Sequence, residues 1–159
     1  MSTQPRLPVF FIPHGGGPWP FLHGPEGILP DNDPWKELEI FLKGFDKALG
    51  RRPKAALVIS AHWEKVDQLT VSTAPHPGML FDYYGFPQHT FELSYPAPGA
   101  PEIAEHVRDV LATSGIETQA DAERGFDHGV FIPFMMMYPD AELPIVMMSL
   151  DPDLTAETH

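Results

Sequence analysis

Cysteine is absent from the 159 residues of this chain. A fold without thiols forms no disulfide bonds, and any metal ion that it binds must be held by nitrogen and oxygen ligands. The composition therefore excludes thiolate zinc fingers and iron–sulfur clusters, and it directs attention to histidine and carboxylate side chains.

Basic residues are also scarce. Lysine and arginine number 10 against 22 aspartates and glutamates, which gives a formal net charge of −12. No cluster of lysine or arginine offers a surface for phosphate backbones or anionic lipids. The apolar run Leu7 to Ile12 stops at Pro13 and is too short for a signal-peptide core or a membrane span. We therefore expect a cytoplasmic protein that binds neither nucleic acid nor membranes.

The length and the 43% hydrophobic content suit one compact domain, residues 1–159. Short apolar runs predict strands, and apolar spacing of three to four predicts helices. The predicted strands are 7–12, 55–60, 69–73, 116–119 and 144–150, and the predicted helices are 33–49, 101–114 and 130–138. Segment 75–101 is dense in proline, glycine and aromatic residues, which predicts a long, ordered, irregular stretch. Alternating strands and helices predict an α/β domain whose central mixed, partly parallel sheet is flanked by helices.

Two histidines follow predicted strands directly. His14 comes after the run 7–12, and His62 comes after the run 55–60. Ligands of open α/β sheets bind beyond the carboxyl ends of strands, and imidazole is a common ligand of divalent iron and zinc. The pair predicts two metal ligands, although a histidine after a strand also occurs as a hydrogen-bonded turn residue.

A third histidine, His128, follows Asp127 at the start of the predicted helix 130–138. A carboxylate can orient an imidazole for proton transfer or for contact with a substrate. Asp127 would equally suit the N-cap of that helix, which requires no catalysis. Both interpretations stay open on the sequence alone.

The stretch HGGGP at 14–18 is similar to an oxyanion-hole motif of certain esterases. Such enzymes need a serine in a Gly-x-Ser-x-Gly turn, and no such turn occurs. Ser60 lies in VISAH and Ser114 in ATSGI. An esterase is therefore the weaker alternative.

Four motifs occur in order along the chain: PHGGGP at 13–18, SAHWE at 60–64, YGFPQ at 84–88 with YPAPGAP at 95–101, and GFDHGVFIP at 125–133. Together they resemble the class III extradiol ring-cleavage dioxygenase family, most closely the branch similar to DOPA 4,5-dioxygenase. The resemblance covers nearly the whole chain.

This resemblance implies an enzyme that opens a catechol-type ring next to its hydroxyls with O₂, using Fe(II), or zinc in some relatives. By motif, His14 and His62 would be metal ligands, and His128 would contact substrate or oxygen as a catalytic and substrate-binding residue. Trp63, Tyr84 and Phe86 would line the pocket of a DOPA-like or other small catechol, together with Phe81 and Tyr83. Packing of an ordinary loop explains these aromatic residues equally well.

Members of this family supply a further ligand and an acid–base histidine from later segments, and nothing after Leu150 resembles those segments. We therefore expect an N-terminal portion of the family fold. A metal-binding module without turnover is the alternative function, because two histidines alone do not complete a triad of two histidines and one carboxylate. The sequence leaves open the choice of catechol, the choice between iron and zinc, and whether the chain forms a homo-oligomer.

Overall fold

The computed structural model describes residues 6–23, 34–64, 66–153 and 155–156. Within this part of the chain, four short strands form one sheet in the order β1-β4-β2-β3. They are β1 (Ala56–Ile59), β2 (Thr70–Ser72), β3 (Gln119–Asp121) and β4 (Ile145–Met148). The pairs β1·β4 and β2·β3 are parallel, whereas β2 and β4 are antiparallel. The predicted mixed, partly parallel sheet is confirmed.

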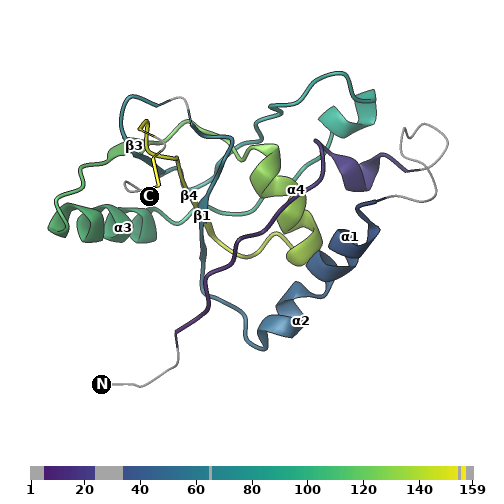
Figure 1. The fold of residues 1–159 in the computed structure, drawn as a ribbon, viewed down its shortest axis with the longest axis horizontal. Coiled ribbons are helices and arrows are strands. Elements are labelled where there is room, and N and C mark those ends of the chain that lie inside the picture. Colours follow the sequence, from purple (N-terminus) through teal and green to yellow (C-terminus); the bar gives the residue numbers. More distant parts are fainter. Residues whose placement is uncertain (1–5, 24–33, 65, 154, 157–159) are drawn as a thin grey trace.

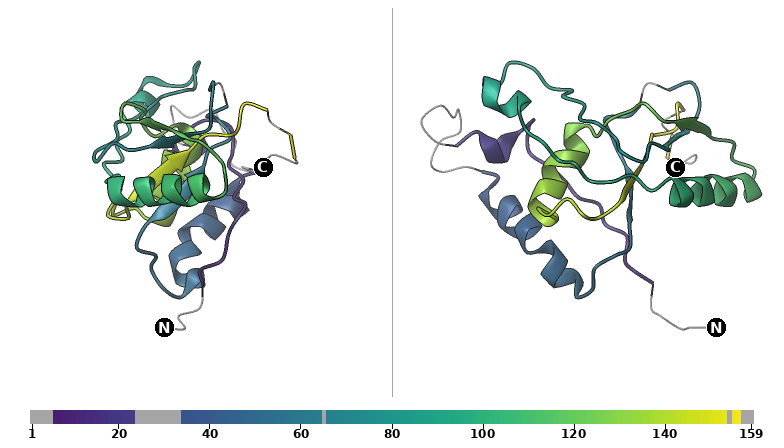
Figure 2. Two further views of the ribbon diagram at one scale, coloured as in Figure 1. Left: turned by 90° about the vertical axis from the view of Figure 1, so that its left-hand side faces the viewer. Right: turned by 180° about the vertical axis from the view of Figure 1, so that it is seen from behind.

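Helices cover both faces of the sheet (Figures 1 and 2). They are α1 (Lys36–Lys43), α2 (Phe45–Leu49), α3 (Pro101–Thr113) and α4 (His128–Met137), with 3-10 turns η1 (Trp19–Phe21) and η2 (Gln88–Phe91). Side chains alternate along a strand. Ile145 and Met147 of β4 therefore share a core with α4, and Val146 between them packs with Ala104 of α3.

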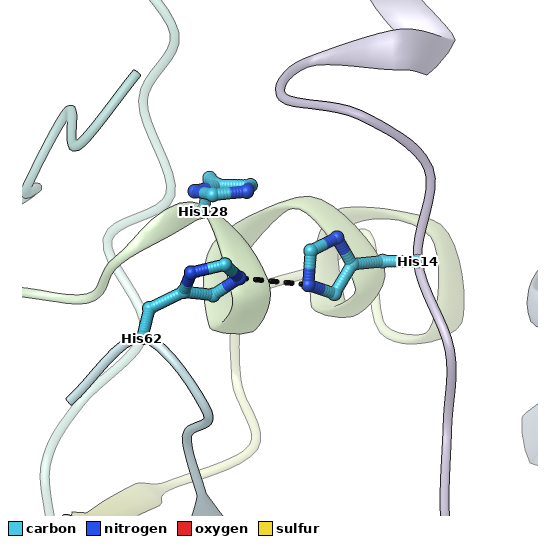
Figure 3. Close-up of side chains that lie close together, drawn as sticks. All are labelled: His14, His62 and His128. Atoms are coloured by element: carbon cyan, nitrogen blue, oxygen red, sulfur yellow. Dashed lines mark hydrogen bonds between the residues drawn. The ribbon is translucent and has the colours of Figure 1, made fainter. Parts of the chain in front are cut away.

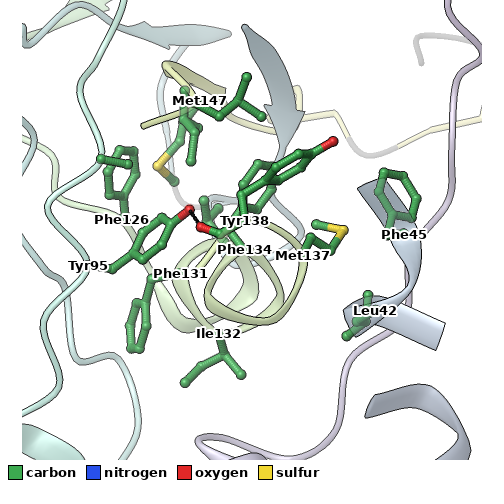
Figure 4. Close-up of a cluster of buried hydrophobic side chains, with 14 of the residues drawn as sticks. Leu42, Phe45, Tyr95, Phe126, Phe131, Ile132, Phe134, Met137, Tyr138 and Met147 are labelled. Atoms are coloured by element: carbon green, nitrogen blue, oxygen red, sulfur yellow. Dashed lines mark hydrogen bonds between the residues drawn. The ribbon is translucent and has the colours of Figure 1, made fainter. Parts of the chain in front are cut away.

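Helix α4 lies at the centre of the larger core. Its side chains Val130, Phe131 and Ile132 are 0% exposed, in keeping with a sequence that is apolar on all sides. Figure 4 shows aromatic residues from other segments around it, including Tyr95, whose hydroxyl donates to the carbonyl of Tyr138 at the end of α4 (2.8 Å). In the described part of the chain, no helix has the length and apolarity needed to cross a membrane.

The predicted helix 33–49 is present as two helices, α1 and α2, that meet at Gly44. Gly50 ends the second helix in the left-handed conformation, with a φ of 74°. This conformation costs glycine little, which is why glycine is so common immediately after helices.

The predicted strand 7–12 is wrong. This segment runs as coil from near the N-terminus toward α4 (Figure 1), and Val9 and Phe11 are each 99% exposed. Pro8 removes a backbone donor that a strand inside a sheet would need. Residues 7–12 are therefore apolar but do not form a strand, and within the described part of the chain no neighbouring strand pairs with them.

One further prediction needs correction, and one strand is less buried than its apolar sequence indicates. The strand expected at 116–119 begins only at Gln119, because residues 114–116 first hydrogen-bond back to the last turn of α3. β1 is present as predicted but is not buried on both faces. Leu57 and Ile59 are 47% and 54% exposed, since α3 packs against β2 and β4 rather than β1.

Replacement of Ile132 by alanine should destabilise the fold strongly, because it leaves a cavity in the core around α4. We expect a loss of about 2–5 kcal/mol in the free energy of unfolding, measured by urea denaturation. The matched control is Ile40→Ala on α1, where the side chain is 55% exposed. Equal losses in the two variants would contradict the assigned core.

Candidate metal centre

Three histidines from distant parts of the chain converge at one point (Figure 3). His14 ends the extended N-terminal segment, His62 lies three residues beyond β1, and His128 is the first residue of α4. Each offers a ligand nitrogen, and these atoms all lie within 4.8 Å of one another. The Nε2 atoms of His14 and His62 are 2.9 Å apart. The structure thus brings together the two histidines predicted as ligands and the histidine predicted to contact substrate.

His14 is held in a form suited to metal binding. Its Nδ1 lies 2.9 Å from the carbonyl of Gly15, so that nitrogen carries the proton and donates. Burial lowers the pKa of His14, and the neighbouring His128 and His62 lower it further, although the Gly15 carbonyl opposes the shift. His14 is therefore neutral at pH 7 and directs the lone pair of Nε2 toward His62.

The glycines of the HGGGP stretch make room for aromatic rings. A Cβ on Gly15 would lie 2.7 Å from Cγ of Trp19, and a Cβ on Gly17 would lie 2.6 Å from the ring of Phe86. Gly17 also has a φ of +53°, which disfavours other residues. The loop that carries His14 is consequently packed between Trp19 and Phe86.

Asp127 connects the loop after β1 to the start of α4. Its carboxylate is fully buried, lies 2.9 Å from the Ser60 hydroxyl that donates to it, and forms an ion pair with Arg124 at 3.1 Å. Ser60 Oγ in turn accepts a hydrogen bond from the backbone N–H of His62 (3.2 Å). Asp127 occupies the N-cap position of α4, as one interpretation of the sequence predicted, but its carboxylate makes no capping hydrogen bond and is engaged by Ser60 and Arg124 instead.

The same contacts bear on the esterase alternative. Ser60 is 4% exposed, and its hydroxyl is engaged by a buried carboxylate. Among the described residues, no histidine side chain hydrogen-bonds to that hydroxyl to activate it. Ser60 is therefore placed to hold the His62 loop rather than to act as a nucleophile.

The carboxylate that orients His128 is Asp82, which the sequence did not single out. Its Oδ1 accepts from both Nδ1 (2.7 Å) and the backbone N–H (3.0 Å) of His128, and its Oδ2 lies 4.0 Å from Nδ1 of His62. Burial raises the pKa of Asp82, but the hydrogen bonds from His128 outweigh burial and the pKa is lowered overall. The only signal in the sequence is a single aspartate within the irregular segment 75–101.

The aromatic residues predicted to line a pocket fall into different environments. Trp63 is 5% exposed, with the Arg124 guanidinium 4.5 Å above its ring. Phe86 packs on Tyr83, whose ring centroid lies 5.8 Å from that of His128. Tyr84 is 91% exposed and makes no ring contact with the three histidines. Tyr83, rather than Tyr84, is the tyrosine beside the cluster.

An open cleft of about 410 Å³ lies beside His62. Its lining side chains include Trp63, Leu80, Asp82 and Arg124. Small-molecule sites commonly measure about 300–1,000 Å³, so the cleft has room for a single aromatic ring. Its walls combine an apolar surface, the carboxylates of Asp82 and Glu64 and the Arg124 cation beside His62.

Comparison with known proteins agrees with this geometry. The model of one family, the catalytic LigB subunit of aromatic ring-opening dioxygenase, matches residues 20–159. The chain belongs to the LigB family. The match includes His62 and His128 and begins six residues after His14.

Relatives of this LigB chain include the 4,5-DOPA dioxygenase extradiol of Beta vulgaris, 38% identical over 95% of this chain and 53% of the relative. Dioxygenase tasH of Hapsidospora irregularis is 38% identical over 94% of this chain and 46% of its own length. A solved structure, an uncharacterized protein of Escherichia coli K12, superposes with a TM-score of 0.61 at 33% identity and covers 87% of this chain and 48% of that one. The chain spans about half the length of the curated relatives it matches.

Replacement of Asp127 by asparagine should destabilise the protein by about 3–5 kcal/mol, because it leaves the Arg124 guanidinium partly buried without its counter-charge. Urea denaturation measures the loss. The matched control is Asp140→Asn, which breaks the exposed ion pair with Arg52 and should change the unfolding midpoint little. Similar midpoints for the two variants would argue against a structural role for the buried pair.

Proposed function

We propose that this LigB chain carries the metal-binding and substrate-facing part of a non-haem dioxygenase that opens a catechol-type ring next to its hydroxyls with O₂. The observation that carries the proposal is the convergence of His14, His62 and His128 from three separate segments. Family membership and relatives named as extradiol dioxygenases support the reaction class. A DOPA-like or other small catechol is the proposed substrate.

His14 and His62 would hold the metal. Two nitrogens about 2.1 Å from one ion and at right angles to each other lie about 3.0 Å apart. The separation of 2.9 Å between the two Nε2 atoms is close to that requirement. The donor set of imidazoles without thiolates suits Fe(II), and zinc would accept the same ligands.

A bound Fe(II) would supply Lewis-acid polarisation of the catechol oxygens and electron transfer between ring and O₂. The residues of the chain perform the other tasks. His128 lies over the His62 ring, with centroids 4.2 Å apart, where it would contact a substrate hydroxyl or oxygen. Trp63 and Phe86 would contribute apolar surface for the ring, and exposed Tyr84 would have to turn toward the cleft to do so.

Metal binding should depend on the two ligands and not on histidine content in general. We expect one divalent ion per chain in equilibrium dialysis with Fe(II) under anaerobic conditions. His14→Ala and His62→Ala should each weaken binding at least about tenfold, because each removes one ligand. His106→Ala on α3, where the side chain is exposed, should leave the affinity unchanged. Equal affinity in all three variants would refute the site.

Oxygen consumption tests the reaction itself. Iron-loaded protein should consume O₂ with at least one member of a panel that includes DOPA and protocatechuate, and His128→Ala should lower the rate about 100-fold or more, since a positioned acid–base group contributes that much. Iron bound at one ion per chain with no uptake across the panel would reject the dioxygenase and favour a metal-binding module.

A further inference from the structure

We infer that Asp82 is a positioning residue that fixes the tautomer of His128, so that His128 meets a bound catechol as a hydrogen-bond acceptor through Nε2. The tautomer is a property of the protein alone. The acceptor role toward a catechol rests on the proposed function.

The argument begins with the hydrogen-bonding capacity of the two groups. A carboxylate is only an acceptor, so the 2.7 Å contact between Asp82 Oδ1 and His128 Nδ1 requires a proton on Nδ1. A neutral imidazole carries one ring proton, which leaves a lone pair on Nε2. Since Asp82 occupies Nδ1, Nε2 is the nitrogen of His128 that remains for the cluster.

Asp82 holds the His128 backbone as well as its ring. The same Oδ1 accepts the backbone N–H of His128 at 3.0 Å. This N–H belongs to the first turn of α4, whose donors have no partner within the helix. Two bonds to one oxygen therefore set the ring orientation relative to the helix.

The loop that carries Asp82 is itself anchored next to α4. Met79 forms a parallel bridge with Phe126, and the backbone N–H of Leu80 donates to the Phe126 carbonyl at 2.8 Å. A Cβ on Gly125 would lie 2.7 Å from the Gly78 carbonyl, so glycine permits the two chains to approach this closely. Asp82 is thus brought to His128 by backbone contacts that do not involve its side chain.

No other acidic group that contacts this part of the site is free for the task. Asp127 precedes His128 in sequence, but its carboxylate is engaged by Ser60 and Arg124. Asp82 alone contacts the His128 ring among the acidic side chains of the described residues.

Nitrogen NMR of histidine-labelled, chelator-treated protein tests the inference directly. At about pH 8.5, well above the usual histidine pKa of about 6.5, long-range proton–nitrogen correlations distinguish a ring nitrogen with a proton from one with a lone pair. The His128 signals are assigned by their loss in His128→Gln. We expect a proton on Nδ1 and a lone pair on Nε2 in the unsubstituted protein.

Asp82→Ala should shift His128 toward the tautomer with the proton on Nε2, and Asp109→Ala, an exposed aspartate on α3, should leave the pattern unchanged. A proton on Nε2 in the unsubstituted protein, alone or together with one on Nδ1, would overturn the inference. So would an unchanged pattern in Asp82→Ala. The measurement on unsubstituted protein decides the tautomer even if Asp82→Ala does not fold.

The kinetic consequence is tested separately. In Asp82→Ala, kcat for catechol-dependent oxygen uptake should fall about 10- to 100-fold, while one ion per chain still binds at saturating iron, because both proposed ligands are retained even though His62 loses its 4.0 Å contact with Asp82. An unchanged kcat would overturn the positioning role. If no catechol is turned over by the unsubstituted protein, the proposed function fails, and the tautomer result still confirms or refutes the action of Asp82 on His128.

Discussion

The buried carboxylate of Asp127 is the interaction on which the arrangement of the site depends. It lies where the loop after β1 meets the start of α4, and it is held by the Ser60 hydroxyl and the Arg124 guanidinium. Ser60 Oγ also accepts a hydrogen bond from the backbone N–H of His62, so the position of His62 depends on that of Asp127. A fully buried charge is costly unless it is paired and hydrogen-bonded, so these partners cannot separate without a large loss of stability. The electrostatic requirement of one side chain thereby sets the distance between two of the three histidines.

A different set of contacts holds each of the three imidazoles. His14 is placed by a loop packed between Trp19 and Phe86, His62 by the Asp127 junction, and His128 by Asp82. Each set of contacts joins a histidine's own segment to a residue distant in sequence, and together they bring three nitrogens within 4.8 Å of one another. Because the partners of His14 and His128 both occupy Nδ1, the Nε2 atoms of these two histidines are left for a metal or a substrate. The geometry therefore supports the proposal that His14 and His62 hold the ion and that His128 contacts the substrate.

Much of this organisation was predictable from the sequence, for identifiable reasons. Apolar periodicity located β1, β4, α3 and α4, and the motif around each histidine predicted the cluster. Apolar content alone could not show whether the run 7–12 has a neighbouring strand, and that prediction was wrong. The sequence offered Asp127 as a carboxylate that could orient His128, with helix capping as the open alternative. Asp127 is adjacent to His128 in sequence, but the acid that contacts the ring is Asp82, brought there by the bridge between Met79 and Phe126. Local patterns do not reveal such a pairing between distant segments.

The central claim is that His14 and His62 form one metal site. An anomalous difference map from crystals grown or soaked anaerobically with Fe(II) tests it most directly, since the map locates iron independently of any assay. The account predicts a peak within bonding distance, about 2.0–2.2 Å, of Nε2 of both histidines. A peak bound elsewhere, or no peak at the cluster in crystals that contain iron, would contradict it.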